Sequence, residues 1–338
     1  MLKKTIKLEK NLKIFKEEFE KFLPKKILDF HIHICPKQAV PTGSFAINAG
    51  GNKLKKYTFD ELKEDMCALY PNREFYGVCF GVPSVNLKTD IMNNYVASVC
   101  DKKNFFPLRI VRPEENEKEV EKDIIKKEFY GFKPYRDYAE KFKKKEEVEI
   151  LDFLPEKILK IADKYGLVIM LHIPKENRLA DKSNQKQIMY ICDKFPYAKI
   201  VLAHIGRAYY FKNIYGNLEK IKKFPNLYFD LAMVNNFEVI EYLFENVAPD
   251  KILYGTDIPI ALAEGKSVEI NDQYTYITPI PWELSISDEK KKIVFTSFVY
   301  EEIRAIKKAV ERTKKDINFI KNLFFYNGYK LLKEVKIK

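Results

Sequence analysis

The sequence predicts a (β/α)8, or TIM, barrel, in which eight parallel strands, each followed by a helix, close into a cylinder. Two observations predict this α/β fold. Short runs of β-branched or aromatic residues alternate with longer helical patterns, as in parallel strands joined by helical crossovers. Several of these runs also end in histidine or aspartate, and functional side chains of such barrels gather at the carboxyl ends of the strands.

The elements are expected in a regular order along the chain. An amphipathic helix is expected first, over residues 8–23, where Leu12, Phe15, Phe19, Phe22 and Leu23 recur at helical spacing before Pro24. The strands are expected near residues 27–33, 75–82, 105–111, 129–134, 167–172, 199–204, 226–231 and 251–256. Helices are expected near residues 155–165, 184–195, 212–224 and 236–248, and two or three more over residues 290–335, outside the barrel.

Two long segments interrupt this repeat. Residues 35–58 and 258–290 contain prolines and glycines without helical or strand periodicity, and the second segment contains the lone tryptophan, Trp282. We expect irregular loops on the catalytic face, where long loops are usually lids or specificity loops. Equally, they can be surface insertions or contacts between subunits, which leaves a homodimer open.

Length and composition favour one large domain. The chain has 338 residues, of which 46% are hydrophobic and 14% aromatic, so it can bury a sizeable core and is not a disordered chain. We expect a single domain over residues 1–338, with the barrel core at about residues 25–260.

The formal net charge of +12 raises the question of a nucleic-acid or membrane partner. The lysines are interleaved with glutamates, as in residues 117–127, which is typical of solvated helix faces. We therefore expect neither partner, and instead a positive field that attracts a small anionic molecule as substrate.

Cysteine usage and the first residues indicate a cytoplasmic protein. Five cysteines, an odd number, form no C-x-x-C pair, as expected for reduced thiols. Residues 1–7 carry positive charges with no apolar segment behind them, and no apolar stretch is long enough to cross a membrane. We expect neither export nor membrane insertion.

All four histidines of the chain end apolar runs. His31 and His33 end the first run, His172 and His204 end two later runs, and Asp257 ends another. Imidazole nitrogen beside carboxylate oxygen suits zinc or a similar divalent ion, and residues two apart on a strand face the same side. Any one of these histidines can instead be a buried core residue, and Asp257 a turn residue. The His-x-His pair, together with the absence of any other histidine, favours a shared metal site.

These residues lie in motifs that resemble a known family. The motifs are Leu28-Asp29-Phe30-His31-Ile32-His33, Leu171-His172, Ala203-His204-Ile205-Gly206, Tyr254-Gly255-Thr256-Asp257 and the closing segment at residues 320–328. Together they resemble the amidohydrolase superfamily, and within it the amidohydrolase-related group. That group includes aminocarboxymuconate semialdehyde decarboxylase-like enzymes, resorcylate decarboxylases and lactonases. The resemblance runs from about Leu23 to Lys333.

The resemblance implies a metal-dependent hydrolase acting on a small, carboxylated substrate. His31, His33, His172 and Asp257 would hold one divalent ion, zinc first, with manganese or iron as replacements. Asp257 would accept a proton from the activated water, and His204 would steady the developing oxyanion. The alternative is a metal-dependent decarboxylase or hydratase that uses the same site, with His204 as acid or base.

Cationic side chains are candidates for binding an anionic substrate. Lys133 ends the fourth strand. The resemblance implies that a lysine at this position either faces the substrate or is carboxylated and bridges two metal ions. As a third alternative, Lys133 can extend along the rim of the barrel into solvent. Arg112 and Arg207 can orient a carboxylate or form surface salt bridges. We expect Asp29 to support a ligand from a deeper layer, and we place Asp230 on the rim, outside the site.

Two other classes remain open at this point. The related barrel deoxyribonucleases also begin with His-x-His, but they have a glutamate at the fourth strand end, where this chain has Lys133. A non-catalytic binding protein on a barrel scaffold is the other class. The full ligand set argues against it, because such a set suits a catalytic metal with an open coordination position.

Overall fold

Eight parallel strands form the predicted barrel. The computed structural model describes residues 8–282, 285–290 and 292–337, so the expectation for residues 1–7 lies outside the described residues. The strands follow one another around the sheet in chain order: β1 (Lys26–His33), β4 (Glu74–Phe80), β5 (Phe105–Ile110), β6 (Gly131–Lys133), β7 (Val168–Leu171), β8 (Lys199–Leu202), β9 (Leu227–Asp230) and β10 (Ile252–Leu253). The N–H of Phe30 donates to the carbonyl of Tyr254 (2.9 Å), and the N–H of His33 donates to that of Ile258 (2.8 Å). These bonds join the last strand to the first and close the barrel.

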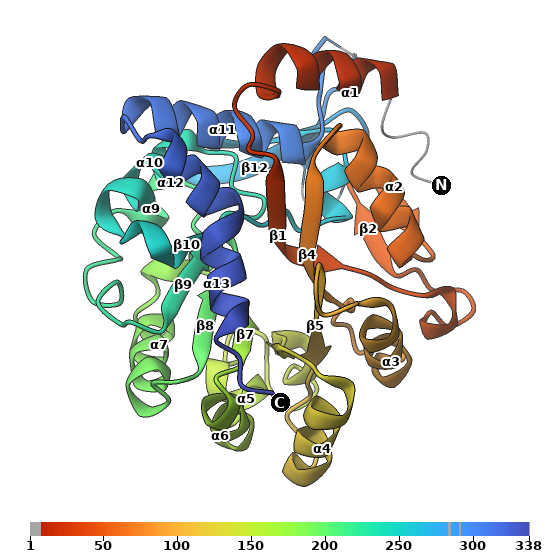
Figure 1. Cartoon of the computed structure of the whole chain (residues 1–338), viewed down its shortest axis with the longest axis vertical. Helices are drawn as coiled ribbons and strands as arrows, with labels where there is room; N and C mark the ends of the chain where they lie inside the picture. Colours follow the sequence, from red (N-terminus) through yellow and green to blue (C-terminus); the bar gives the residue numbers. More distant parts are fainter. Residues whose placement is uncertain (1–7, 283–284, 291, 338) are drawn as a thin grey trace.

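Helices surround the strands (Figure 1). They are α2 (Phe59–Leu69), α3 (Thr89–Val99), α4 (Glu117–Lys127), α5 (Ile150–Phe153), α6 (Glu156–Tyr165), α7 (Lys182–Lys194), α8 (His204–Arg207), α9 (Phe211–Ile214) and α10 (Phe237–Asn246). Short 3-10 turns lie at Lys37–Ala39, Arg136–Tyr138, Arg178–Ala180, Pro249–Lys251 and Ile260–Leu262. The helix expected at residues 212–224 is wrong, because only α9 forms and Gly216 then takes a left-handed conformation with φ of 69°.

Further helices flank the barrel at both ends of the chain. The amphipathic helix expected first is α1 (Leu8–Ile14) followed by a π-helical turn, Phe15–Phe19, which buries Phe15 and Phe19. Near the C-terminus lie α11 (Phe298–Arg312) and then α12 (Ile317–Lys321), a π-helical turn (Asn322–Tyr326) and α13 (Asn327–Lys333) in direct succession. Phe325, Leu331 and Leu332 of this last stretch pack with the side chains of the barrel interior. None of the helices in the described residues has the length and hydropathy needed to span a bilayer.

The two segments expected to be irregular contain small sheets. Residues 35–58 include the hairpin β2 (Ile47–Ala49) and β3 (Asn52–Leu54), and the later segment forms a three-stranded sheet of β11 (Lys266–Ile270), β12 (Gln273–Thr278) and β13 (Ser285–Ser287). Most of these strands are too short to produce a recognisable alternation of polar and apolar residues. Ile47, Tyr276 and Trp282 from these segments line a cavity of the barrel, as expected of specificity loops.

Gly131 allows β6 to lie against β7, and this close approach predicts a large effect of substitution. A Cβ at this position would lie 1.9 Å from the carbonyl oxygen of Val168, which belongs to the backbone and cannot rotate away. We expect Gly131→Ala to lower the free energy of unfolding by about 3 kcal/mol, measured by urea denaturation. Gly77→Ala is the control, because its Cβ would meet the flexible Cδ1 of Ile32 at 2.5 Å, at a cost of about 1 kcal/mol. Equal losses in the two variants would contradict this reasoning.

Candidate metal centre and active site

A cavity of about 220 Å³ opens at the carboxyl ends of the barrel strands. It is lined by His31, His33, Ile47, Val82, Pro83, Lys133, Tyr135, His172, His204, Tyr209, Met233, Asp257, Ile260, Tyr276 and Trp282. A larger cavity of about 760 Å³ lies beside Gly166 and Lys199, where β8 begins, and no histidine lines it. The smaller cavity therefore holds the candidate site, because it brings all four histidines together with Asp257.

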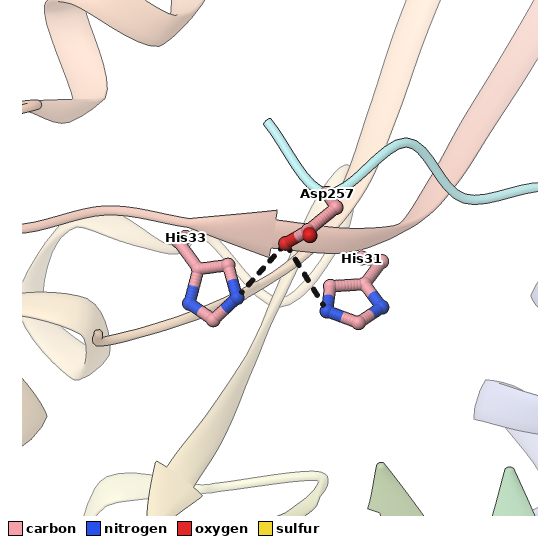
Figure 2. A group of neighbouring side chains, drawn as sticks. All are labelled: His31, His33 and Asp257. Carbon is pink, nitrogen blue, oxygen red and sulfur yellow. Dashed lines mark ion pairs between the residues drawn. The ribbon is translucent and has the colours of Figure 1, made fainter. Parts of the chain in front are cut away.

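His31, His33 and Asp257 converge on one point. Nε2 of His31 lies 3.5 Å, and Nε2 of His33 3.2 Å, from the same Oδ1 of Asp257. Figure 2 shows both rings turning a nitrogen toward that carboxylate. One ligand atom from each of the three residues lies within 4.8 Å of the others. Two imidazole nitrogens and a carboxylate oxygen form a donor set that fits zinc and similar divalent ions.

The opposite nitrogens of three histidine rings are held by hydrogen bonds. Nδ1 of His31 lies 2.9 Å from Oδ2 of Asp230, Nδ1 of His33 lies 2.9 Å from the Gly81 carbonyl, and Nδ1 of His204 lies 2.8 Å from the Ala232 carbonyl. Each acceptor favours the tautomer in which Nδ1 carries the proton and Nε2 carries the lone pair. Metal-binding histidines are usually oriented in this way.

His31, His33 and Asp257 form a trio of candidate ligands. His172 reaches the cavity but stands apart from this trio. Its ring centre lies 5.4 Å from that of His204, and its buried Nδ1 has no hydrogen-bond partner among the described residues. The ligand atoms of His31, His33 and Asp257 form a compact group to which His172 does not belong. Burial lowers the pKa of both His31 and His172 well below the usual value, which favours the neutral form that a metal requires.

Asp230 lies inside the site, so its expected position on the rim is wrong. Its side chain is fully buried at the end of β9, where Oδ2 contacts Nδ1 of His31 and Oδ1 accepts the backbone N–H of His204 (2.7 Å). Asp29 supports the site through the backbone, since its Oδ1 accepts the N–H of His31 (2.9 Å) and that of Thr256 (3.0 Å). The sequence signal for Asp230 was its position at a strand end, the same as that of the proposed ligands.

Lys133 faces the cavity and does not extend into solvent. It is 1% exposed, its Nζ lies 3.5 Å from Nε2 of His31, and the same atom lies 4.9 Å from the centre of the Phe80 ring. Burial lowers the pKa of the Lys133 ammonium to about 8. A cation is thus placed directly beside the candidate metal ligands.

The two arginines differ from each other. Arg112 does not line the cavity, and its guanidinium lies 3.7 Å from Asp90 and 3.8 Å from Glu115, so the structure does not support its expected contact with substrate. Arg207 donates through one terminal nitrogen to the carbonyls of the three residues after His172, at 3.2, 3.3 and 3.2 Å. Among the described residues, no carboxylate forms an ion pair with Arg207. Arg207 does not line the cavity either, so its contact with substrate stays a prediction, and the structure shows only its charge beside the loop after His172.

Strained backbone accompanies two of the site residues. His204 has φ of 57° and Asp257 has φ of 70°, which is unusual for residues other than glycine. The surrounding bonds hold both conformations, because the N–H of His204 donates to Asp230 and that of Asp257 donates to the His31 carbonyl (2.9 Å). Strain of this kind is concentrated at functional sites.

Aromatic residues form a wall of the cavity, and its tyrosines were not among the predicted site residues. Tyr209 stacks on Tyr274 of β12 with ring centres 4.8 Å apart, and Tyr276 of the same strand stacks on Trp282 at 5.2 Å. Tyr135 packs beside His172 at 5.2 Å. Tyrosines are common core residues, and only the alternation of Tyr274 and Tyr276 marked this wall in the sequence.

Comparison with known proteins addresses the fold and the family of the chain. The family model described as amidohydrolase matches residues 28–292. Among solved structures, amidohydrolase 2 from Bifidobacterium longum subsp. infantis has a TM-score of 0.56 at 13% identity, over 92% of this chain and 99% of that chain. A zinc-bound amidohydrolase from Burkholderia multivorans has a TM-score of 0.59 at 11% identity, over 91% and 99% of the two chains. The structure of 4-oxalomesaconate hydratase from Rhodopseudomonas palustris has a TM-score of 0.54 at 15% identity, over 91% of this chain and 96% of that chain.

The two kinds of comparison carry different weight. At these identities the solved structures show a shared fold, whereas the family match spans most of the chain. No curated protein matches the sequence. The predicted resemblance is confirmed: the chain belongs to the amidohydrolase family and is an enzyme of the hydrolase or lyase type.

Proposed function

We propose that the protein is a metal-dependent hydrolase that acts on a small, carboxylated substrate. The observation that carries this proposal is the convergence of His31, His33 and Asp257 on one point of a cavity that also contains Lys133. Neutral imidazoles and a carboxylate supply metal ligands, and the neighbouring lysine supplies a positive charge for an anion.

The proposed metal ligands are His31, His33, Asp257 and, from the next wall of the cavity, His172. Together they would hold one divalent ion, zinc in the first place, with manganese or iron as replacements. Such an ion would supply Lewis acidity, which lowers the pKa of water and polarises a carbonyl group.

Asp257 and His204 would move protons during the reaction. Asp257 faces the cavity and would accept the proton of the attacking water and pass it to the leaving group. His204 donates through Nδ1 to Ala232, so its Nε2 is the atom available to the substrate. With Nε2 protonated, His204 would donate to a developing oxyanion; unprotonated, it would act as a base.

Charge and size support a small anionic substrate. Lys133 places a buried cation in a cavity of only about 220 Å³, and Arg207 adds positive charge beside His172. A cavity of this size suits a small molecule rather than a nucleic acid or a membrane surface. A cytoplasmic location belongs to the same proposal and is supported by the five free thiols.

A decarboxylase or hydratase that uses the same site is the second candidate. It is favoured by the position of His204 Nε2, which faces the cavity and, once protonated, would deliver that proton to carbon. The fold is also shared with a structure named as a hydratase.

A panel of carboxylated lactones, amides and carboxylic acids, assayed with the purified metal-loaded protein, tests the proposal. Hydrolysis is expected for at least one carboxylated member, recorded as released acid, with little or no turnover of the uncharged analogue, which Lys133 cannot attract. Release of carbon dioxide, or addition of water to a double bond, would select the second candidate. Turnover of neutral compounds alone would contradict the role given to Lys133.

A further inference from the structure

Glu302 is a fully buried carboxyl group outside the described cavity. It lies on α11, packed against the barrel from outside, and is 0% exposed. Its Oε2 accepts the backbone N–H of Met233 at 3.0 Å, while Oε1 has no hydrogen-bond partner among the described residues. A buried carboxyl is costly to retain, so its single hydrogen bond requires an explanation.

That hydrogen bond reaches His204 through one peptide group. The peptide between Ala232 and Met233 is held at both ends: its carbonyl accepts from Nδ1 of His204 at 2.8 Å, and its N–H donates to Glu302. Because a peptide group is planar, the direction of its N–H sets the direction of its carbonyl. A rotation of this peptide would therefore turn the acceptor away from His204.

The turn that contains this peptide needs external support. Met233 has φ of 60°, a left-handed conformation that is unfavourable for a residue other than glycine, and its side chain lines the cavity. On the other side of the peptide, the N–H of Ala232 donates to Oδ1 of Asp230 at 3.2 Å, the oxygen that also holds the N–H of His204. Glu302 contributes the bond that holds the peptide from outside the barrel.

The protonation state of Glu302 is consistent with a pure acceptor role. Burial, reinforced by the negative charges of Asp29, Asp230 and Asp257, raises the pKa of Glu302 well above its usual value. The neutral acid needs only its carbonyl oxygen to accept from Met233. A glutamine side chain also provides a carbonyl oxygen as acceptor. A leucine side chain has a similar size but no hydrogen-bond acceptor.

We propose that Glu302 is a positioning residue for His204 and acts through the Ala232–Met233 peptide. By fixing the carbonyl of Ala232, it keeps the proton of His204 on Nδ1 and leaves Nε2 facing the cavity. A helix near the C-terminus thus sets the orientation and tautomer of a histidine that follows β8.

Imidazole ¹⁵N spectra of the full-length protein test this proposal without a substrate. The chain has four histidines, so at most eight ring-nitrogen signals arise, and those of His204 are identified by their loss in His204→Asn. In Glu302→Leu we expect the His204 signals to shift, and exchange of the Met233 amide proton to rise about tenfold, while the His33 signals stay in place. Glu302→Gln is expected to retain both wild-type properties.

Glu301→Leu is the matched control, because Glu301 is the neighbouring residue of α11 and its carboxylate contacts Arg304 at 2.6 Å and not the Met233 peptide. It should leave the His204 signals unchanged. If Glu302→Leu does not fold, Glu302→Asp withdraws the carboxyl by one methylene and permits the same comparison. Unchanged His204 signals and Met233 exchange in the folded variant would overturn the proposal. This readout is independent of turnover, so failure of the hydrolase proposal would not affect it.

Discussion

Replacing Asp257 by alanine is expected to remove both the bound metal ion and the activity. Asp257 contributes the only carboxylate of the trio, and its Oδ1 faces both His31 and His33. Without it, the imidazoles of His31, His33 and His172 remain beside the Lys133 cation, which repels a divalent ion. Elemental analysis should find one equivalent of metal per chain in the wild type and less than ~0.1 in the variant, with activity lowered by at least about 10³-fold.

Asp250→Ala is the matched control for this change. Asp250 lies just before the first residue of β10, whereas Asp257 follows the last one. Asp250 forms a surface ion pair with Lys251 at 3.7 Å, so removing the Asp250 carboxylate should alter neither metal content nor activity. A fully loaded and active Asp257→Ala protein would exclude Asp257 from the ligand set. Two equivalents of metal in the wild type would instead point to a carboxylated Lys133 that bridges two ions.

The second large effect is expected for His204→Asn, which should keep its metal and lose its activity. Asparagine adopts the left-handed conformation found at His204 more readily than most residues, so the turn after β8 should be preserved. The imidazole that would exchange protons with the substrate is removed, which we expect to lower kcat by about 10²- to 10⁴-fold. The metal content should stay near that of the wild type, because His204 lies outside the trio formed by His31, His33 and Asp257. His204 also lies close to His31 and Asp230, but there Oδ2 of Asp230 is already bonded to Nδ1 of His31.

The surface variant Lys102→Asn separates the chemical effect from a backbone effect. Lys102 also has a left-handed backbone, with φ of 59°, and it lies between α3 and β5, away from the cavity. We expect this variant to be fully active. Turnover by His204→Asn at the wild-type rate would remove His204 from the mechanism, and a loss of metal in that variant would make it a ligand.

Much of the barrel could be predicted because its signals are local. A buried parallel strand requires a short apolar run, and all eight expected strands are present within a few residues of their expected bounds. The helix expected at residues 212–224 failed for a local reason as well, since Gly216 takes a left-handed conformation shortly after the end of α9.

The parts that could not be predicted depend on contacts between distant residues. Nothing near Asp230 in the sequence indicates that it would meet the ring of His31, which comes from another strand. Arg112 follows a strand end as a site residue would, but its guanidinium forms ion pairs with Asp90 of α3 and with Glu115 of its own loop. Glu302 gave no signal, because a glutamate in a charged helix is ordinarily solvated.

The sequence by itself determined the alternation of strands and helices, the position of four histidines and one aspartate at strand ends, and the family resemblance. These properties follow from the spacing of apolar residues and from residue identity, which are present in the unfolded chain. Only the tertiary structure decided which atoms meet: Asp257 with His31 and His33, Asp230 with His31, and Glu302 with the peptide that holds His204. The physical reason is that barrel closure and helix packing set these distances, through strand register and side-chain packing across the whole chain.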